Sequence, residues 1–117
     1  MASHISIQSS SARIRVRVEE IVVADSRNTQ LLLEGNLPPR HYFPREDVEM
    51  GLLVPSESVT HCPHKGDARY WSVDLKGHEL DDAVWSYEEP LPEMAEIAGL
   101  LCFYDERVTL EVEDLTQ

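Results

Sequence analysis

Alternating apolar and polar residues predict paired strands near the start of the chain. Over residues 13–18, three arginines alternate with isoleucine and valine, which is typical of a strand with one buried face. Residues 21–24 follow two glutamates and form a plausible second arm of a hairpin, although no glycine or asparagine supplies the positive φ that tight hairpin turns prefer. Residues 31–34 fit a third strand or a helical turn, and residues 41–43 fit a short strand that Pro44 ends.

The middle of the chain contains the clearest hairpin. Residues 45–53 have a mixed spacing that allows one short helical turn, and residues 59–62 resemble a strand before a turn at 63–66. Residues 68–75 and 78–87 then flank a turn at Lys76 and Gly77. Two extended runs on either side of such a turn predict a β-hairpin.

The last third of the chain predicts a short helix and another pair of strands. Pro90 and Pro92 break the extended run, and Pro92 suits the first position of a helix, with Gly99 as its stop. Residues 100–104 and 108–112 then form a predicted final strand pair around residues 105–107.

Together these elements predict a mainly β protein. We expect a single compact domain of about seven or eight short strands in a curved or two-layer sheet, with one or two short helical turns. Because so little helix is available to cover a sheet, the core must lie between two sheets or inside a strongly curved one. We expect the domain to span residues 13–113, between a flexible polar N-terminus at 1–12 and a C-terminal tail at 114–117.

The charge of the chain excludes some partners. Its 117 residues contain 10 Lys+Arg and 22 Asp+Glu, which give a formal net charge of −12. Binding to nucleic acid through the phosphate backbone requires clustered cations, as does binding to anionic membrane surfaces, so we expect neither. The acidic excess is concentrated in residues 59–117, with 14 acidic and 4 basic residues. This half forms either a solvated acidic face or a surface that recruits a basic partner.

The expected location follows from what the sequence lacks. No apolar run approaches the roughly 20 residues that span a bilayer, and residues 1–11 have no apolar signal-peptide core. We therefore expect a cytoplasmic protein whose two cysteines, Cys62 and Cys102, are free thiols. Cys102 lies in an apolar run and is expected to be buried, whereas Cys62 lies in a predicted turn.

The segment His-Cys-Pro-His-Lys-Gly, from His61 to Gly66, allows three interpretations. It can be a plain turn, since proline fixes φ and Gly66 permits a left-handed exit. It can supply zinc ligands through His61, Cys62 and His64, but adjacent ligands converge poorly and no fourth ligand is evident, so we predict no metal site. It can also line a pocket in which Lys65 binds an anion and Cys62 is a wall residue or a nucleophile, because a cationic neighbour lowers the pKa of a thiol. We take Cys62 and Lys65 as the candidate catalytic residues.

Aromatic residues of the central hairpin supply a candidate pocket wall. Alternation sends Tyr70 and Trp71 to opposite faces, whereas Trp85 and Tyr87 share one face. Such residues either form core, because aromatic pairs stabilise sheets, or form a wall for a planar ligand. Polar anchors can come from the Pro-Arg-Glu-Asp-Val segment, which follows a proline break and is expected in a loop. The predicted ligand-binding residues are Arg45, Glu46, Asp47, Tyr70, Trp85 and Tyr87.

Several segments together resemble a known family. They are VVADS at residues 22–26, YFPREDV at 42–48, THCPHKGDARYWSV at 60–73 and AVWSYEEPLPEMAEIAGLLCFY at 83–104. In this order and at this separation they look like the family known as domain of unknown function 427, over roughly residues 15–107. The resemblance implies a compact, mostly β single domain and implies little about activity.

The same family carries a nucleotidyltransferase-like label, which can be tested on the residues. Nucleotidyl transfer needs carboxylates that hold a divalent metal on a triphosphate, usually as a D-x-D or D-x-E pair after a Gly-Ser loop. The chain has no Gly-Ser dipeptide, and its pairs Glu46 with Asp47 and Asp81 with Asp82 are adjacent, so on a strand they would point to opposite faces. These departures weigh against transferase chemistry.

The sequence therefore predicts a domain that binds a small anionic or nucleotide-like molecule in a pocket near Cys62 and Lys65. Catalysis there is an open alternative, and the cofactor is unknown. Two other interpretations are a protein-interaction module that presents its acidic C-terminal half and a structural subunit of a homo-oligomer. A concave cleft lined by Cys62, Lys65, Tyr70 and Trp85 would favour ligand binding, whereas exposed aromatics without a hollow beside Lys65 would favour the interaction module.

Overall fold

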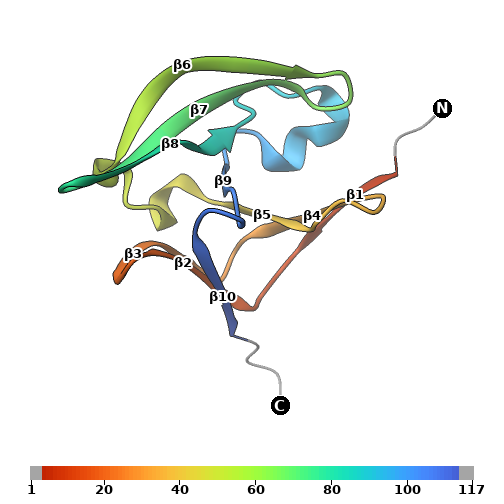
Figure 1. Ribbon diagram of the computed structural model, residues 1–117. Helices are drawn as coiled ribbons and strands as arrows, with labels where there is room; N and C mark the ends of the chain where they lie inside the picture. Colours follow the sequence, from red (N-terminus) through yellow and green to blue (C-terminus); the bar gives the residue numbers. More distant parts are fainter. Residues whose placement is uncertain (1–3, 114–117) are drawn as a thin grey trace.

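The computed structural model describes residues 4–113 and consists mainly of antiparallel strands (Figure 1). A seven-stranded sheet has the order β1-β4-β5-β9-β8-β7-β6, and a three-stranded sheet has the order β10-β2-β3. The predicted mainly β class is confirmed. The strands are β1 (Ile5–Ser9), β2 (Arg13–Val18), β3 (Ile21–Ser26), β4 (Gln30–Glu34), β5 (Arg40–Phe43), β6 (Leu53–Cys62), β7 (Gly66–Leu75), β8 (His78–Ser86), β9 (Leu101–Phe103) and β10 (Thr109–Glu113), and the 3₁₀ helices are η1 (Arg45–Asp47), η2 (Met50–Leu52) and η3 (Pro92–Ile97).

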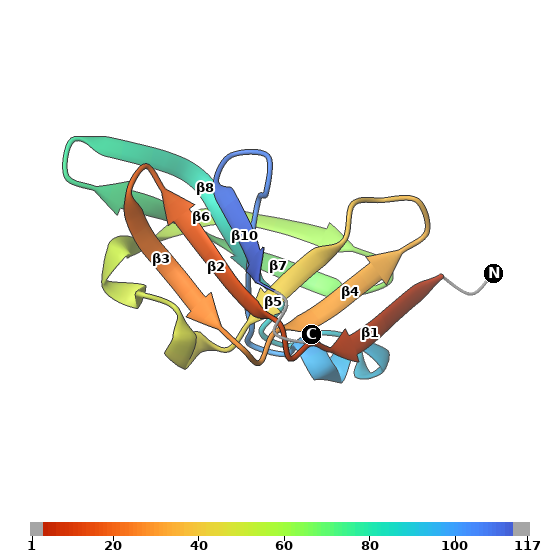
Figure 2. The same ribbon diagram turned by 90° about the horizontal axis from the view of Figure 1, so that it is seen from below.

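The large sheet bends so strongly that β6, β7 and β8 lie above β5, β4 and β1 in Figure 1, with β9 between these two arms. Figure 2 shows the three strands of the small sheet side by side, next to β5, β4 and β1. The small sheet covers one face of the large sheet, and η3 covers part of the other. Each face of the large sheet therefore has its own cluster of buried side chains.

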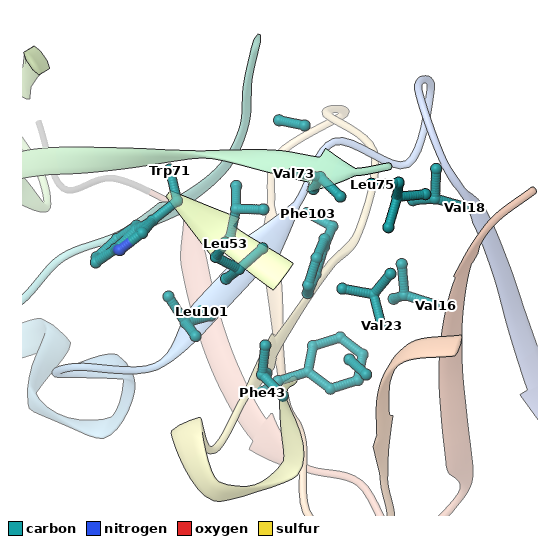
Figure 3. Close-up of a cluster of buried hydrophobic side chains, with 14 of the residues drawn as sticks. Val16, Val18, Val23, Phe43, Leu53, Trp71, Val73, Leu75, Leu101 and Phe103 are labelled. Carbon is teal, nitrogen blue, oxygen red and sulfur yellow. The ribbon is translucent and has the colours of Figure 1, made fainter. Parts of the chain in front are cut away.

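The main core lies between the small sheet and the first face of the large sheet (Figure 3). Val16 and Val23 of the small sheet are fully buried and point towards Phe43, Val73 and Phe103 of the large one. The rings of Phe43 and Phe103 meet edge to face, with centroids 5.7 Å apart. Because β2 contributes every second residue to this core, its three arginines face outwards, as the alternation predicts.

On the second face of the large sheet, aromatic side chains with polar groups form a row that Cys102 interrupts. Tyr70 lies opposite Trp85, Trp85 opposite Cys102, and Cys102 opposite Tyr42 across four neighbouring strands. Cys102 is 1% exposed, which confirms its predicted place in the interior. Tyr70 and Trp71 lie on opposite faces, and Trp85 and Tyr87 share one, as predicted.

The predicted pairing of the last two strands is wrong. β9 pairs with β5 and β8 in the large sheet, whereas β10 pairs with β2 in the small sheet. Opposite charges explain this choice, because Glu111 of β10 lies 3.5 Å from Arg15 and 3.2 Å from Arg17 of β2. The apolar Leu110 and Val16 are also register partners. The chain therefore crosses between sheets at a point where local sequence suggests a simple hairpin.

The N-terminal segment also departs from the expectation of a flexible polar N-terminus at 1–12. Residues 5–9 form β1, which pairs with β4 along its whole length. Ile5 and Ile7 pack against the second cluster, and this alternation gives the segment a face to bury. Residues 1–3 of the expected flexible N-terminus and the expected tail at 114–117 lie outside the described residues.

Local chemistry accounts for the remaining differences. β6 is longer than the predicted 59–62 because it is an edge strand, where Pro55 can be accommodated, and its register shifts between Pro55 and Val59. The turn after β2 takes its positive φ at Glu19, at 57°, without a glycine. Residues 45–53 contain two 3₁₀ turns instead of one, and the helix that begins at Pro92 is also 3₁₀. Within residues 4–113, no helix has the length and apolar character needed to cross a membrane.

Candidate functional site

The second face of the large sheet contains a pocket that all four tyrosines of the chain help to line. Its volume is about 220 Å³. Strands β4, β5, β7 and β8 contribute side chains, together with residues that follow β4, β6, β8 and β9. We call it the tyrosine pocket. Its lining residues are Leu32, Glu34, Leu37, Pro38, Arg40, Tyr42, Lys65, Tyr70, Trp85, Tyr87 and Tyr104.

The aromatic residues divide by chemistry between the core and this pocket. Both phenylalanines and Trp71 belong to the main core, whereas Trp85 and every tyrosine line the pocket. Phenylalanine has no polar atom to satisfy, whereas the tyrosine hydroxyl needs a hydrogen-bond partner when its ring is buried. The pocket wall therefore combines buried ring surface with hydroxyl groups.

Trp85 lies at the centre of this wall. Its side chain is 7% exposed, and its ring centroid is 4.5 Å from that of Tyr104. Trp85 Nε1 donates a hydrogen bond of 3.1 Å to the hydroxyl of Tyr42, whose ring stands edge to face at 6.3 Å. Because the Tyr42 oxygen accepts this bond, its own proton can be donated to another group.

Three of the tyrosine hydroxyls have a raised pKa, which holds them in their neutral form. Burial raises the pKa of Tyr42 and of Tyr87 above the ordinary value. Burial also raises the pKa of Tyr104, and the neighbouring Tyr70 hydroxyl adds to this effect. At neutral pH these three groups are therefore uncharged donors and acceptors of hydrogen bonds.

Arg40 is a pocket residue that sequence reasoning missed. Its guanidinium carbon lies 5.3 Å from the ring centroid of Trp85 and 5.7 Å from that of Tyr104. Its side chain is 19% exposed and pairs with Glu106 at 3.3 Å. Its position in the sequence could have indicated this role. Arg40 lies two residues before Tyr42 on the same strand, and alternation places both side chains on one face.

Lys65 reaches the pocket from the turn between β6 and β7. Its backbone N–H donates to the Cys62 carbonyl, and its own carbonyl accepts from Leu91, so the turn is fixed to the segment before η3. The Lys65 ammonium donates to Glu34 Oε1 at 2.7 Å and lies 5.9 Å from the Tyr87 ring centroid. Glu34 thus occupies one of the three donors of the side chain that we expected to bind an anion.

Among the lining residues of the pocket, cations outnumber carboxylates. Arg40 and Lys65 line it together with a single carboxylate, Glu34. The partner of Arg40, Glu106, is 58% exposed and is not a lining residue. In a protein with a net charge of −12, this is a local environment that favours an anion.

Cys62 lies beside the pocket and does not line it. The thiol is partly buried and packs against the second cluster at the end of β6. The preceding His61 is 69% exposed and contacts Asp67 at 2.7 Å, while His64 is exposed in the turn. Among the hydrogen bonds of residues 4–113, none joins the Cys62 thiol to an imidazole. In the same part of the chain, no three His, Cys, Asp or Glu residues form a group that could hold a metal ion.

The predicted anchors in η1 lie away from the pocket. The Arg45 guanidinium lies 5.4 Å from the Trp71 ring centroid, on the side of the main core. Asp47 accepts a 2.7 Å hydrogen bond from the Ser26 hydroxyl of β3, and Glu46 is exposed. The structure therefore leaves these three residues, like Cys62, out of the pocket lining, while it brings the remaining predicted residues together. Those that line the pocket are Lys65, Tyr70, Trp85 and Tyr87.

Besides the adjacent carboxylate pairs, the chain contains a D-x-E pair, Asp47 and Glu49. With Glu46 and Asp25 it lines a separate hollow of about 180 Å³ next to β3. Asp25 is held by two hydrogen bonds from Arg13, at 2.9 and 2.7 Å. At least part of this acidic group is thus engaged with side chains of the protein itself.

Comparison with known proteins agrees with the resemblance found in the sequence. A family model described as domain of unknown function (DUF427), with the label NTP_transf_9, matches residues 6–114. The matched segment includes every residue that lines the tyrosine pocket. A search among curated proteins gives no significant match.

Proposed function

This chain belongs to the DUF427 family, and we propose that its function is to bind a small planar anion in the tyrosine pocket. One observation carries the proposal: both cations of the pocket lie against its aromatic rings. The Arg40 guanidinium is placed over Trp85 and Tyr104, and the Lys65 ammonium lies near Tyr87. The hollow beside Lys65 is what we expected of a ligand site, although Cys62 is not part of its lining.

The occupied ring faces support an anionic ligand over a cationic one. Aromatic cages that bind cationic ligands offer bare ring faces to them. Here the faces of Trp85 and Tyr104 are already engaged by Arg40. Apart from Glu34, which Lys65 already engages, the polar groups of the lining include the N–H donors of Arg40 and Lys65 and the hydroxyl proton of Tyr42. These donors suit oxygen anions.

A planar ligand is supported by the shape of the wall. Beyond the faces that Arg40 covers, the rings of Trp85, Tyr104 and Tyr42 lie at close spacing in the wall, which suits contact with a flat apolar body. Planar carboxylates and nucleotide-like molecules both combine such a body with an anionic group. Cys62 as a nucleophile stays a prediction, since it lies beside this wall and does not line it.

Thermal denaturation with small anions tests the proposal. The probes are benzoate, phenyl phosphate, AMP and inorganic phosphate at constant ionic strength. A ligand at about ten times its Kd stabilises the folded state by roughly 1.4 kcal/mol, which raises the Tm of a domain of this size by about 5 °C. We expect such a shift with at least one planar anion, and we expect Arg40→Ala and Lys65→Ala to abolish it.

Matched variants control for charge and for changes in basal stability. Arg27→Ala and Lys76→Ala each remove the same side chain from an exposed position outside the pocket. Each variant is compared with itself, with and without the anion, so that its own Tm cancels. If no planar anion raises the Tm of the wild type, or if all four variants respond equally, the proposal is wrong.

A further inference from the structure

The tyrosine pocket adjoins a second hollow. Its own volume of about 220 Å³ is below the roughly 300–1,000 Å³ of sites that enclose a complete small-molecule ligand. Tyr70 and Tyr104 also line a neighbouring hollow of about 410 Å³, which we call the Asp82 hollow. The two cavities therefore share a wall of two tyrosines. The other residues of the Asp82 hollow are Ser58, Thr60, Asp82 and Arg107.

The Asp82 hollow contains an ionised hydrogen-bond acceptor. Hydrogen bonds from Ser56 and Ser58 lower the pKa of Asp82, and the Ser58 hydroxyl donates to Asp82 Oδ2 at 2.7 Å. Thr60 adds a hydroxyl, which is 2.9 Å from that of Tyr70. A carboxylate has about four acceptor positions, so Asp82 retains capacity for hydroxyl groups of a ligand.

The backbone places Asp82 at this position through an unusual conformation. Its φ is 51°, in the left-handed region that residues other than glycine rarely adopt. The Asp82 N–H donates to the Ser72 hydroxyl at 3.1 Å, and the register of β7 with β8 shifts between Trp71 and Val73. Such irregularities cost free energy and are enriched where a side chain is redirected towards a functional site.

One turn borders both cavities. Tyr104 is part of the shared wall, Glu106 pairs with Arg40 of the tyrosine pocket, and Arg107 lines the Asp82 hollow. Arg107 Nη1 also donates to the Asp81 carbonyl next to the bulge. The turn after β9 thus connects the cation of one cavity with the polar groups of the other.

We infer that the two cavities form one extended site, for a planar anion that carries a polyhydroxylated substituent. This inference rests on the proposed function, because the planar anionic end is placed at Arg40, Lys65 and Trp85. The hydroxyl-bearing part extends past Tyr70 and Tyr104 into the Asp82 hollow. There the Asp82 carboxylate accepts hydrogen bonds from the ligand hydroxyls, which are stronger than bonds between neutral groups.

Two probes that share the planar anion test the inference by calorimetry on the full chain. 4-Methoxybenzoate presents only the planar carboxylate, whereas 4-carboxyphenyl β-D-glucopyranoside carries a sugar in place of the methyl group. We expect the glucoside to bind about tenfold more tightly than 4-methoxybenzoate. This is the gain in affinity expected from one hydrogen bond between a sugar hydroxyl and the Asp82 carboxylate. Asp82→Gly should reduce this ratio to about one and leave 4-methoxybenzoate affinity unchanged, since glycine adopts positive φ freely.

Two further variants complete the test. Asp81→Ala removes the neighbouring exposed carboxylate and should preserve the ratio. Thr60→Val replaces a hydroxyl on the exposed edge strand with a methyl group and should lower the ratio, which provides a second test if Asp82→Gly does not fold.

The outcomes separate the extended site from the proposed function. Equal affinities for both probes, or a ratio that survives Asp82→Gly and Thr60→Val, would overturn the extended site and leave binding in the tyrosine pocket standing. Failure of both probes to bind the wild type, together with no response to the other planar anions, would overturn the proposed function and this inference with it.

Discussion

Replacing Glu34 by glutamine should lower stability and raise anion affinity, two effects of opposite sign from one change. Glu34 accepts a 2.7 Å hydrogen bond from Lys65, and the two side chains are only 23% and 11% exposed. Exposed ion pairs contribute about 0–1 kcal/mol to the free energy of unfolding, and breaking a fully buried pair lowers it by about 3–5 kcal/mol. Glutamine keeps the shape and one acceptor oxygen but removes the charge.

The expected cost of Glu34→Gln therefore lies between those limits, at roughly 1.5 kcal/mol. For a domain of this size, that corresponds to a Tm lower by about 6 °C. The same change removes a negative charge that opposes an anion at Lys65. Even at the high effective dielectric of a partly exposed site, one like charge nearby weakens binding by on the order of tenfold. We expect the Kd for 4-methoxybenzoate to fall by about that factor.

Urea unfolding and titration calorimetry at neutral pH and low salt measure the two effects. Glu89→Gln is the matched control, because it changes the net charge equally at an exposed position outside the pocket. It should alter neither quantity appreciably. A loss of stability in Glu34→Gln without tighter anion binding would refute the reasoning, since Lys65 would then be only a structural partner of Glu34.

Two further predictions concern the pocket wall and the turn that carries Lys65. Burial raises the folded-state pKa of Tyr42, Tyr87 and Tyr104, so their stabilising contribution is present below about pH 10 and is lost as the pH rises from there. Tyrosinate absorbance of the folded protein should therefore lag that of the urea-unfolded chain, and coincident titrations would contradict this burial. Gly66→Ala should lower stability by about 2 kcal/mol in urea unfolding, because φ is 115° and a Cβ would lie 3.3 Å from Pro90 Cα. Gly51→Ala, with no positive φ and no atom within 4 Å, should be nearly neutral, and equal losses in both would count against this explanation.

Much of the fold was predictable because strand patterning is local. Residues 13–18 form β2 over the predicted range, and the hairpin of β7 and β8 turns at Lys76 and Gly77 as expected. Alternation also predicted correctly that Tyr70 and Trp71 lie on opposite faces and that Trp85 and Tyr87 share one. These features follow from a two-residue period that each segment carries within itself.

The candidate site was only partly predictable for a related reason. Tyr70, Trp85 and Tyr87 could be grouped because they belong to one hairpin and the residue that follows it. The charged segment after Pro44 makes Arg45 one of the predicted polar anchors, but its guanidinium lies over the Trp71 ring. Arg40, which lies over Trp85, comes from β5, and nothing in the local pattern places this strand with only β9 between it and β8.

The sequence by itself determined most of the strand segments, which of their side chains share a face and how acidic the molecule is. Only the tertiary structure decided that β10 leaves β9 to pair with β2, and that the tyrosines, Arg40 and Lys65 meet in one pocket. The pocket depends on contacts between distant residues: Lys65 meets Glu34 across 31 positions, and Trp85 meets Tyr42 across 43. Such contacts depend on strand order and charge pairing over the whole chain. The alternation of apolar and polar residues within one segment contains no information about them.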